Sequence, residues 1–561
     1  MIDDIIMKHA LKNTQAHGKA SPKAVVGKVI AEHPDCKKDM KGTMKKIATI
    51  VEKVNSMSPE QIEKEISNYT FTTKKKVEKG LKLEGAEHGK VITRFPPEPS
   101  GYPHIGHAKA AYLDMTAARK YDGKFILRFD DTNPEAESQE YVDAIKDALG
   151  WLAIDWDVEE YASDSLQKLY GYAERMIAEG NAYVCTCTPE QIRSNRSNTK
   201  ECQCRSIAYD EGASHWKSML DGTVKRGEAI VRFSGNMTSL NTAMRDPTLF
   251  RIINSPHYRQ GNKYRVWPSY DFAAPILDSL SGVTHAMRTK EYELRDEVYN
   301  EILDSLGLRK PKIVEFSRLS IRGLPVSKRL LKPLIAKKLV SGWDDPRLPT
   351  ITALKRRGIR PEAIKRFVLR FGLGKTESNP TIEALLVDNK KILDPVAERY
   401  FFVLSPVKLT VRSAPKIKAE LKKHPDKELG KREMNTAGEF FISSKDADSL
   451  KQGEQFRLKD LYNVKLIQKA EELVGEFVGK EVGPGPKIQW VTTDYLEATV
   501  LVPDELVDSQ GKVLEHSLRI DRGYCEPSCA DIPEGHVIQF ERYGFCRLDK
   551  KVGLQFIYTN P

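Results

Sequence analysis

Apolar residues near the start of the chain recur at the spacing of amphipathic helices. This spacing is clear over residues 5–11 and 47–54. The segment SMSPEQIEKEI predicts a helix that starts with Ser58 as N-cap and Pro59 at the first helical position. A Lys-rich, Gly-containing stretch over residues 73–90 has the composition of a linker. We therefore expect a helical segment followed by a connection to the rest of the chain.

From Val91 onward, short apolar runs alternate with longer amphipathic segments. The pattern predicts strands at 91–95 and 124–129 and helices at 104–120 and 135–152. This alternation is typical of a doubly wound parallel sheet, whose ligands bind at the carboxyl ends of the strands.

The alternation of strands and helices predicts the α/β fold class. Later segments change pattern again, which predicts several domains. The β-like runs near the C-terminus predict one or two β-barrels. The expected parts are a helical N-terminal appendage (1–87), a Rossmann-like domain in two halves (88–180 and 264–320), an insertion (181–263), a loop and helical connector (321–398) and the barrels (399–561).

Composition excludes several classes of protein. Hydrophobic residues make up 40% and charged residues 30% of the 561 residues, which excludes a fully disordered or fibrous chain. No run of 18 apolar residues predicts a membrane span, and the first ten residues lack the pattern of a signal peptide. Eight cysteines in a chain of this length favour a reducing compartment. We expect a cytoplasmic protein without membrane contact.

Positive charge is concentrated in one segment. The net charge of the chain is +11, but residues 309–375 hold 19 Lys and Arg against four acids, so the remainder is mildly acidic. Such a segment suits a polyanion such as nucleic acid. Solvated helix faces are an equally good interpretation of the charge alone.

The segment RFPPEPSGYPHIGHAKAAYL, residues 94–113, has the densest chemical signal. His104 and His107 would share one face of a helix, beside its positive N-terminus. This arrangement would stabilise charge on a transferring phosphorus. Gly106 would leave room for a flat base. Two surface histidines are the alternative, and the strand, loop and helix around them favour the site.

A second segment, Val326-Ser327-Lys328-Arg329, lies in a loop within the basic block. Alone it predicts nothing, because many surface loops carry such residues. Together with the histidine segment it predicts that the ammonium group of Lys328 reaches the β- and γ-phosphates of ATP.

The two segments resemble the signature motifs of class I aminoacyl-tRNA synthetases. The blocks RFPPEPSGYPHIGHAKAA, LRFDDTNP, MRDPTLFRI, YDF, EFSRL, VSKR and GWDDPRLPT resemble the glutamyl/glutaminyl-tRNA synthetase family of archaeal and eukaryotic type. The resemblance runs from about Val91 to the C-terminus, with its sharpest motifs between residues 94 and 350. Val326 stands where the family often has Met, an apolar change that leaves Lys328 in place.

The resemblance implies a two-step reaction. A substrate carboxylate attacks the α-phosphorus of ATP, which yields an acyl-adenylate and pyrophosphate, and the acyl group then moves to the terminal ribose of tRNA. Mg²⁺ is expected with the ATP. The implied roles are catalysis for His104, His107 and Lys328, ATP binding for Glu98, Gly106, Thr289, Arg318, Leu319 and Lys328, and amino-acid binding for Arg94, Asp130, Tyr270 and Arg288, with Arg94 at the α-carboxylate and Asp130 at the ammonium.

Arg288 bears on the choice between glutamate and glutamine. Within the resembled family, glutamyl enzymes carry arginine here and glutaminyl enzymes a small neutral residue. A guanidinium pairs with a buried carboxylate through charge-assisted hydrogen bonds, whereas a neutral amide would leave it under-paired. We therefore expect L-glutamate as substrate. The alternative is that Arg288 points outward to a phosphate or an acidic neighbour.

Four cysteines lie within twenty residues. Cys185-x-Cys187 and Cys202-x-Cys204, with fourteen residues between the pairs, match the four thiolates of a closed structural Zn²⁺ site. The C-x-C spacing is tighter than the usual C-x₂-C, and buried free thiols are the alternative. Within the resemblance, this insertion would pack on the tRNA acceptor stem. For Cys36, Cys525, Cys529 and Cys546 we expect ordinary burial.

The resemblance also implies partners. The expected RNA substrate is tRNA(Glu), with tRNA(Gln) as a second candidate, and the barrels would read the anticodon. We expect a monomer or weak oligomer. Aromatic and basic residues interleave over 540–551, as base stacking or a barrel core would require. Alternative functions are a glutaminyl enzyme, a non-catalytic tRNA-binding paralogue and a nucleotidyl-transferring enzyme with a non-RNA substrate.

Overall fold

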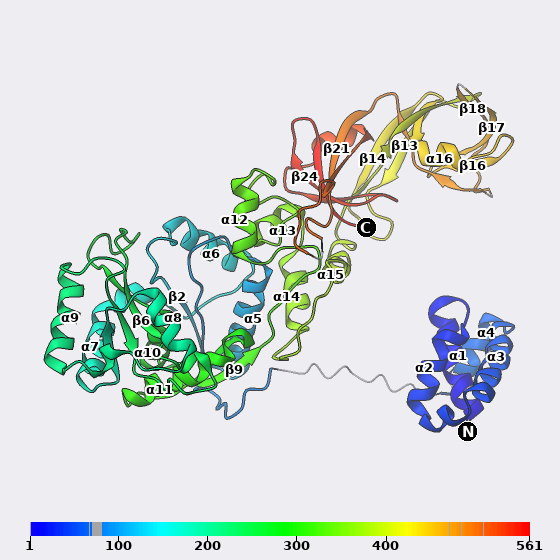
Figure 1. Ribbon diagram of the computed structural model, residues 1–561. Coiled ribbons are helices and arrows are strands. Elements are labelled where there is room, and N and C mark those ends of the chain that lie inside the picture. The colour runs from blue at the N-terminus through cyan, green and yellow to red at the C-terminus, as the bar shows by residue number, and fades with distance from the viewer. Residues whose placement is uncertain (1, 67, 70–80, 471, 484, 509) are drawn as a thin grey trace. The chain divides into compact units, whose positions relative to one another are not determined.

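The chain forms two compact units, Met1–Gly80 and Leu81–Pro561 (Figure 1). The computed structural model describes residues 2–66, 68–69, 81–470, 472–483, 485–508 and 510–561.

The first unit is helical, as its apolar spacing predicted. Ile6, Val25, Ile47 and Val54 are fully buried between its helices. The segment before the last helix forms the predicted cap, because the Ser58 hydroxyl accepts a hydrogen bond from the Gln61 backbone N–H. The elements are α1 (Ile2–His17), α2 (Pro22–Glu32), the 3₁₀ turn η1 (Pro34–Asp39), α3 (Met40–Asn55) and α4 (Pro59–Ile66).

The predicted linker over 73–90 lies outside the described residues as far as residue 80. Beyond that point Leu81 and Leu83 are buried in a cluster with Leu113 and Phe316. This part of the segment therefore belongs to the core of the second unit.

Two groups of parallel strands form the centre of the second unit. The order β1-β2-β3 and the pair β8-β9 are both parallel. The two groups adjoin, because Thr284 donates its backbone N–H to the carbonyl of Ile92 at 2.9 Å. The strands are β1 (Ile92–Phe95), β2 (Lys124–Phe129), β3 (Val158–Tyr161), β8 (His285–Thr289) and β9 (Lys312–Phe316).

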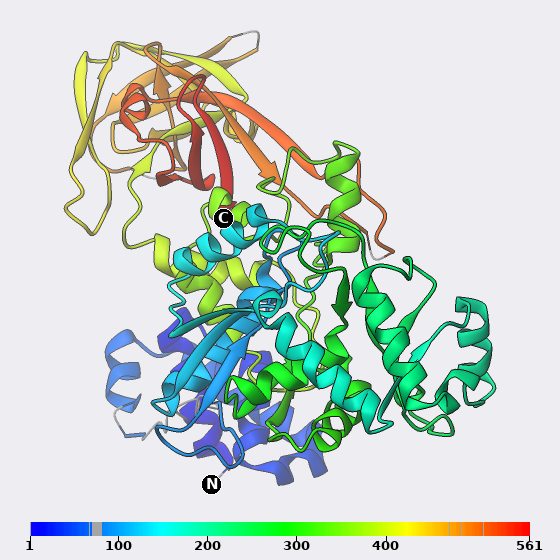
Figure 2. The same cartoon turned by 90° about the vertical axis from the view of Figure 1, so that its left-hand side faces the viewer.

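Helices cover both faces of this sheet (Figure 2). Phe125, Leu127 and Phe129 of β2 pack with helices α5 and α6, whereas Ile126 packs on the other side with α11. Because side chains alternate between the faces of a strand, this division identifies the predicted doubly wound architecture. The helices are α5 (Ile105–Lys120), α6 (Gln139–Trp151), η2 (Ala162–Ser165), α7 (Leu166–Ala178), α10 (Tyr270–Leu280), η5 (Lys290–Arg295) and α11 (Asp296–Ser305).

An antiparallel sheet of order β4-β5-β6-β7 interrupts the parallel one. Its core joins Val231 and Phe250 to Phe272 of α10, so the insertion shares a hydrophobic cluster with the second half of the parallel-sheet domain. The elements are β4 (Ala182–Cys185), α8 (Pro189–Ser197), η3 (Gln203–Ser206), α9 (Tyr209–Asp221), β5 (Ile230–Phe233), η4 (Thr242–Met244), β6 (Thr248–Ile252) and β7 (Val266–Pro268).

Short helices connect the sheet domain to the C-terminal region. Ile364 and Phe367 are fully buried in the same cluster as Phe125 and Leu127 of the parallel sheet. In Figure 1 these helices lie between α5 and the strands β21 and β24. They are α12 (Lys328–Ala336), α13 (Ile351–Arg357), α14 (Pro361–Leu369) and α15 (Glu383–Leu393).

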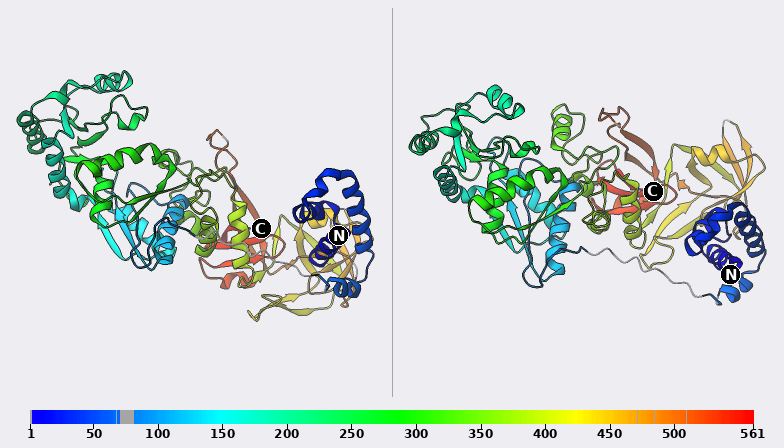
Figure 3. Two further views of the ribbon diagram at one scale, coloured as in Figure 1. Left: turned by 90° about the horizontal axis from the view of Figure 1, so that it is seen from below. Right: turned by 60° about the horizontal axis from the view of Figure 1, so that its bottom comes forward.

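The C-terminal region consists of two seven-stranded sheets with separate cores (Figure 3). The first has the order β10-β23-β24-β25-β21-β22-β11. Its edge strands β10 and β11 are joined only by Phe401, so the two edges must meet and the sheet closes as a barrel. Its strands are β10 (Arg399–Tyr400), β11 (Phe402–Leu404), β21 (Leu496–Pro503), β22 (Leu518–Cys525), β23 (Val537–Phe540), β24 (Gly544–Lys550) and β25 (Gln555–Asn560), with η6 (Pro527–Asp531).

The second sheet, of order β19-β16-β17-β18-β12-β15-β20, lies in the chain between the two parts of the first. Its core contains Phe440, Tyr462 and Trp490. Its elements are β12 (Pro406–Arg412), β15 (Glu439–Ser443), α16 (Ser444–Ser449), β16 (Gln455–Leu458), β17 (Asn463–Lys469), β18 (Leu473–Gly479), β19 (Lys487–Ile488) and β20 (Val491–Thr492), with a hairpin of β13 (Ile417–Lys422) and β14 (Lys431–Thr436).

The hydrophobic pattern predicted element positions closely in the sheet domain. The strand at 124–129 has the predicted bounds, and the predicted helix over 104–120 begins at Ile105 with His104 as its N-cap. The predicted helix over 135–152 is shorter, because the chain after β2 first makes a turn and α6 spans Gln139–Trp151. Of the described helices, none combines the length and apolar content needed to cross a lipid bilayer.

Candidate functional site

A cavity of about 390 Å³ opens where strands β1 and β2 end. This volume is in the range of small-molecule sites. Four residues predicted from the sequence line it, namely Glu98, His107, Asp130 and Tyr270. The rest of the lining consists of Phe95, Pro96, Pro97, Thr132, Asn133, Glu137, Ala162, Arg251, Ala273, Ala274 and Tyr292.

The start of helix α5 fixes both predicted histidines. The Nδ1 atom of His104 accepts the backbone N–H of Gly106, and Nδ1 of His107 accepts that of His104, each at 3.1 Å. In each neutral ring the remaining N–H therefore lies on Nε2. The ring centroids are 3.9 Å apart. The two imidazoles form one surface at a positive helix end.

Gly106 makes room for a histidine. A Cβ atom at this position would lie 2.9 Å from Cε1 of His104. The predicted role, space for a flat base, therefore competes with space for the His104 ring.

The segment around residues 343–351 supports the same helix start. The backbone N–H of Ile105 donates to Pro349 at 3.0 Å, and that of Ile351 donates to Pro103 at 2.9 Å. These bonds fix the histidine loop to the connector, so the GWDDPRLPT block has a structural role here.

A buried carboxylate, Asp278 of α10, organises the charges beside the cavity. Its Oδ1 accepts hydrogen bonds from Arg94 Nε at 2.9 Å and Arg128 Nη1 at 2.7 Å. Its Oδ2 accepts the Tyr299 hydroxyl at 2.8 Å. Arg128 also donates from Nε to Asp130 Oδ1 at 2.9 Å. One aspartate thus fixes both arginines, and through Arg128 also Asp130.

Both arginines keep one terminal nitrogen without a hydrogen bond. Nη2 of Arg94 and Nη2 of Arg128 are buried, and neither makes a hydrogen bond to any of the described residues. Burial disfavours the charged form of Asp278, but Arg94 and Arg128 outweigh this effect and hold its pKa below the usual value. Burial raises the pKa of Asp130 although Arg128 opposes the change.

Arg288 faces the protein interior. Its side chain is 3% exposed, and Nη2 lies 2.9 Å from both the Tyr292 carbonyl and Asp296 Oδ1. Within the described part of the chain, its Nε and Nη1 atoms are buried without a hydrogen-bond partner. The guanidinium carbon lies 5.4 Å from the Tyr292 ring centroid and 5.3 Å from that of Tyr299.

This position combines the two interpretations of Arg288 made from the sequence. The side chain has an acidic neighbour, as the alternative stated, yet it points inward. Burial raises the pKa of Asp296 to about 6 although Arg288 opposes the shift. Arg288 and Arg94 both lie close enough to Tyr270 to act on its pKa, which burial raises to about 12. Tyr270 therefore lies beside two under-paired cations.

The predicted nucleoside residues lie at the ends of β8 and β9. Thr289 is the last residue of β8, Arg318 pairs with Glu291 at 2.9 Å, and Leu319 is 2% exposed. The adjacent Ser317 carbonyl and hydroxyl accept hydrogen bonds from Lys109 of α5. Helix α5 and the loop after β9 are thus joined by a buried lysine.

The second sequence motif lies at the start of helix α12. Val326 is 8% exposed and belongs to the same hydrophobic cluster as Ile105 and Leu319. Val326 therefore belongs to the core that also holds the first residue of the histidine helix. The side chain of Lys328 is outside the described part, so its predicted phosphate contact stays a prediction.

The four clustered cysteines come together in space. Their Sγ atoms all lie within 4.8 Å of one another, with 3.6 Å between Cys185 and Cys202, 3.3 Å between Cys187 and Cys202 and 3.8 Å between Cys187 and Cys204. Tetrahedral Zn²⁺ with bonds of about 2.3 Å requires sulfur separations of about 3.8 Å. The donor set and the spacing fit such an ion. Cys525, Cys529 and Cys546 are buried in the first barrel, as expected.

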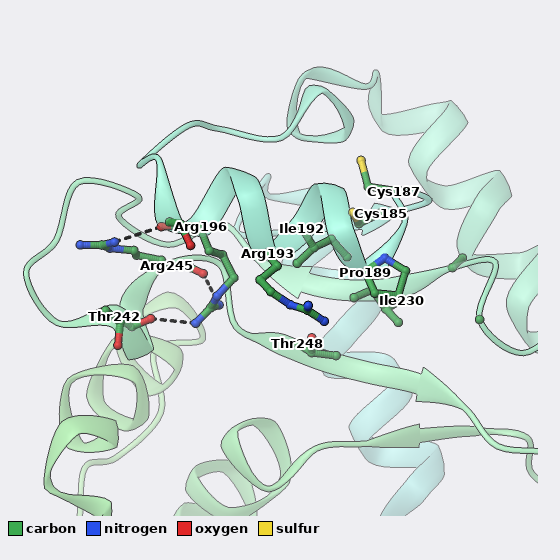
Figure 4. Close-up of a pocket in the computed structure, with 13 residues that line it drawn as sticks. Cys185, Cys187, Pro189, Ile192, Arg193, Arg196, Ile230, Thr242, Arg245 and Thr248 are labelled. Atoms are coloured by element: carbon green, nitrogen blue, oxygen red, sulfur yellow. Dashed lines mark hydrogen bonds between the residues drawn. The ribbon is translucent and has the colours of Figure 1, made fainter.

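A second cavity, of about 510 Å³, lies beside the cysteines (Figure 4). Helix α8 contributes Arg193 and Arg196. Arg196 donates from Nη2 to the Thr242 carbonyl at 2.9 Å and from Nη1 to the carbonyl of Arg245, so it holds the opposite wall together.

A third cavity, of about 850 Å³, adjoins both others. It shares Arg196 and Thr248 with the cavity beside the cysteines, and Arg251, Tyr270 and Tyr292 with the cavity at the strand ends. The three cavities therefore adjoin one another in a row, and several arginines line them.

The basic block has structural as well as surface roles. Arg356 pairs with Asp549 of the first barrel at 2.7 Å, and Arg347 pairs with Asp345 at 2.8 Å. Of the interleaved residues over 540–551, Phe540 and Phe545 are fully buried. These aromatics are therefore barrel core, the second of the two interpretations.

Several residues of the site were not predicted, notably Arg128, Asp131, Arg251, His257 and Asp278. One signal could have indicated two of them. Arg128 and Asp278 are charged residues within the apolar runs KFILRF and FAAPILD. A charge in a buried strand or helix is paired when it is tolerated, so such positions mark candidate sites.

Comparisons with known proteins agree with the geometry. Residues 90–395 match the family model for "tRNA synthetases class I (E and Q), catalytic domain", and residues 397–479 and 487–549 match two models for the anti-codon binding domain of the same class.

Similar proteins cover the chain almost completely. A glutamate–tRNA ligase of Nitrosopumilus maritimus is 44% identical over 99% of this chain and 98% of its own length. A glutamate–tRNA ligase of Cenarchaeum symbiosum is 41% identical over 97% of each chain. A crystal structure of a glutamate tRNA ligase from Elizabethkingia meningosepticum, in complex with its amino acid, is 19% identical with a TM-score of 0.39, over 55% of this chain and 70% of that one.

Proposed function

Because this chain belongs to the class I tRNA synthetases of the E and Q family, we propose that it is an ATP-dependent ligase that joins L-glutamate to tRNA(Glu). The observation that carries the choice of glutamate is the pair of buried, under-paired arginines beside Tyr270, Arg94 and Arg288. A substrate carboxylate would supply the acceptors that these N–H groups lack.

In the first step the α-carboxylate of glutamate attacks the α-phosphorus of ATP, and the bond to pyrophosphate breaks. In the second step a hydroxyl of the terminal tRNA ribose attacks the acyl carbon, and AMP leaves. Catalysis rests on positioning and on stabilisation of the charge that builds on the phosphorus, because no enzyme nucleophile is needed.

The start of α5 and the ends of β8 and β9 would hold ATP. The Nε2–H groups of His104 and His107, at a positive helix end, suit phosphate oxygens. Glu98 and Gly106 would frame the nucleotide, Thr289, Arg318 and Leu319 would surround the nucleoside, and Lys328 would contact the phosphates. Mg²⁺ would accompany ATP as part of the substrate.

The 390 Å³ cavity would hold glutamate. Asp130 and Tyr270 line this cavity, and Asp130 would bind the ammonium group. Arg94 and Arg288 do not line it but lie beside Tyr270, from where they would bind the α-carboxylate and the side-chain carboxylate. Glutamine would bring a neutral amide to Arg288. The buried guanidinium would then stay under-paired, which costs about 1 to 3 kcal/mol.

A pyrophosphate exchange assay in the presence of tRNA tests this assignment. Arg288→Cys should lower glutamate-dependent exchange by about tenfold to a hundredfold, because one charge-assisted pair is lost. The control is Arg119→Cys, since Arg119 lies on the same domain in a half-exposed ion pair with Asp157. Unchanged kinetics for Arg288→Cys would remove this residue from the glutamate site.

The four cysteines would hold a structural Zn²⁺ that braces the insertion. The short sulfur separations support a closed site, and four thiolates fill the four positions of a tetrahedral Zn²⁺. Purified protein should contain about one zinc per chain by elemental analysis, and Cys202→Ser should lose it. Zinc-free wild-type protein with an intact insertion would argue for plain buried thiols.

The arginine-bearing cavities and the barrels suit tRNA. The row of three cavities, which runs from the cysteines to the strand ends, would guide the acceptor strand of tRNA. The C-terminal sheets would bind the anticodon. Charging assays with tRNA(Glu) and tRNA(Gln) determine whether both are substrates.

We place the protein in the cytoplasm as a monomer or weak oligomer, with domains at 1–87, 88–180, 181–263, 264–320, 321–398 and 399–561.

One aminoacylation assay separates the remaining candidate functions. A glutaminyl enzyme would prefer glutamine, a non-catalytic paralogue would bind tRNA without charging it, and a nucleotidyl transferase would not depend on tRNA. The buried Arg288 opposes the first. The histidine pair at the cavity opposes the second, and the anticodon-binding matches oppose the third.

A further inference from the structure

One wall of the 390 Å³ cavity is the turn that follows β2. Asp130, Thr132 and Asn133 of this turn line the cavity, and so does Glu137 just beyond it. The residue between them, Asp131, is fully buried and does not line the cavity. Its side chain points to the opposite side of the turn, where different partners hold it.

Asp131 joins the turn to two other elements. It accepts the backbone N–H and the hydroxyl of Ser163, each at 2.8 Å, which fixes the turn to η2, directly after β3. It also accepts the hydroxyl of Tyr258 at 2.9 Å. Tyr258 belongs to the loop between β6 and β7, so the insertion reaches the back of the cavity wall.

His257 precedes Tyr258 in this loop and is 2% exposed. Its Nδ1 accepts the backbone N–H groups of Arg259 at 3.2 Å and Gln260 at 3.1 Å. The proton of the neutral ring therefore lies on Nε2. That atom is 3.7 Å from Asp131 Oδ2 and 3.7 Å from Glu137 Oε2.

The second carboxylate, that of Glu137, connects His257 to a residue that lines the cavity. Glu137 Oε2 accepts the backbone N–H of Asn133 at 2.9 Å, and Asn133 lines the cavity. The Nε2–H dipole of His257 thus faces two carboxylates that hold the turn from either end. Both distances exceed that of a hydrogen bond, so the interaction is an electrostatic contact in a buried region.

The loop that carries His257 is itself well fixed. His257 and Gly261 exchange two backbone hydrogen bonds, of 2.9 and 2.8 Å. The imidazole also packs against Trp267, with ring centroids 4.9 Å apart. A fixed loop presents the ring in one orientation, which a positioning contact requires.

Electrostatics agree with a neutral ring. Burial lowers the pKa of His257 although Asp131 opposes the change, and burial raises the pKa of Asp131 to about 6. Arg259 and Asp164, on the loop and on η2, pair with each other at 2.7 Å beside this cluster. No arginine or lysine pairs with Asp131 among the described residues, and besides its three hydrogen bonds the carboxylate has the His257 Nε2 atom 3.7 Å away.

We propose that His257 is a positioning residue of the glutamate site, which holds the turn 130–137 through Asp131 and Glu137 from inside the insertion. The inference rests on the proposed function, because it assigns the 390 Å³ cavity to glutamate. His257 contacts neither cavity nor substrate, and it acts through the placement of Asp130 and Asn133. Glutamate binding should depend on it, and ATP binding should not.

Two substitutions separate the two nitrogen atoms of the ring. His257→Asn keeps an acceptor near Nδ1 for the loop amides but has no donor that reaches the carboxylates. His257→Gln places a donor near Nε2 but removes the acceptor for the loop. We expect His257→Asn to raise the KM for glutamate about five- to tenfold with little change in the KM for ATP. His257→Gln should lower the unfolding temperature but keep most of the glutamate affinity.

The measurements are steady-state pyrophosphate exchange with tRNA, at varied glutamate and at varied ATP, and thermal unfolding of the full chain. Tyr258→Phe removes one acceptor contact of Asp131 and should shift the glutamate KM in the same direction by a smaller factor. The matched control is His285→Asn, because His285 is a buried histidine that contacts Thr284 and the Glu84 carbonyl away from the cavity.

The inference is overturned if His257→Asn leaves the glutamate KM within about twofold of wild type, or if it raises the KM values for glutamate and ATP equally. It is also overturned if His285→Asn gives the same glutamate-specific change. Wild-type protein that activates no glutamate would instead overturn the proposed function, and this inference with it.

Discussion

Buried arginines have different surroundings in the catalytic domain and in the C-terminal barrel region. In the barrel region, Arg432 of β14 is 1% exposed and pairs at 2.8 Å with the fully buried Glu526, which directly follows β22 of the first barrel. Its Nη1 donates to the Lys422 carbonyl, and its Nη2 lies 3.6 Å from Glu541. Each of its nitrogen atoms thus has an acceptor or an opposite charge nearby.

The arginines of the catalytic domain are equally buried but less completely paired. Arg94 and Arg128 share one carboxylate, Asp278, and each keeps a buried Nη2 without an acceptor among the described residues. Arg288 has two such nitrogen atoms. Unpaired buried donors cost free energy, so they persist where a ligand supplies the acceptor. Arg432 therefore needs no further acceptor, whereas Arg94 and Arg288 could bind a ligand carboxylate without losing an existing partner.

The largest expected effect comes from replacing Arg94 of the catalytic domain with a residue of the same charge. Arg94→Lys keeps a cation near Asp278 but cannot supply the spare N–H of the guanidinium fork. Glutamate-dependent pyrophosphate exchange should fall about a hundredfold to a thousandfold in kcat/KM. Circular dichroism checks that the variant is folded. A variant with the wild-type KM for glutamate would show that the spare N–H groups of Arg94 do not bind the substrate.

The barrel arginine should affect stability and leave glutamate activation unchanged. Arg432→Met leaves Glu526 buried without its partner, which should lower the free energy of unfolding by about 3 to 5 kcal/mol. Urea unfolding measures this loss. The double variant Arg432→Met/Glu526→Gln should recover most of it, because neither charge then remains. A fall in exchange activity at a temperature where Arg432→Met is folded would contradict the structural role.

The smallest expected effect concerns Asp131, a buried carboxylate that, unlike Asp278, has no arginine partner among the described residues. Arginines hold the pKa of Asp278 below its usual value, whereas burial raises that of Asp131 to about 6. Between pH 4 and 6 the folded state therefore binds more protons at Asp131 than the unfolded state does. The free energy of unfolding should fall by about 1 to 2 kcal/mol from this residue as pH rises through that window.

Urea unfolding of wild type and Asp131→Asn at pH 4.5, 5.5 and 6.5 tests the sign, since the variant should lack this part of the slope. Parallel pH dependence in the two proteins would show that Asp131 does not titrate in this range.

Much of the fold follows from local pattern. The apolar alternation gave the bounds of β2, and the strand, loop and helix around His104 correctly predicted an N-terminal helix end at the histidine pair. The four cysteines could be grouped from spacing alone, because both pairs lie within one short segment. In these cases the residues that meet in space are near one another in the chain.

The rest of the site depends on contacts that span long stretches of sequence. Arg94 and Asp278 are 184 positions apart, and Asp131 and Tyr258 are 127 apart. No periodicity indicates such a pair, since it exists only after parallel strands and the insertion have assembled. Arg288 was expected to face a substrate carboxylate, and its neighbour Asp296 could not be predicted because it depends on the turn through η5.

The single residue between β10 and β11 has a consequence for the order of folding. Both strands are made before the second sheet, yet their partners β22 and β23 follow it, as does β25, which lies between β24 and β21. During synthesis the second sheet is complete once β20 has been made, whereas the first must wait for β25, about sixty residues further along the chain. We therefore expect the second sheet to assemble while the first is still waiting for its remaining strands.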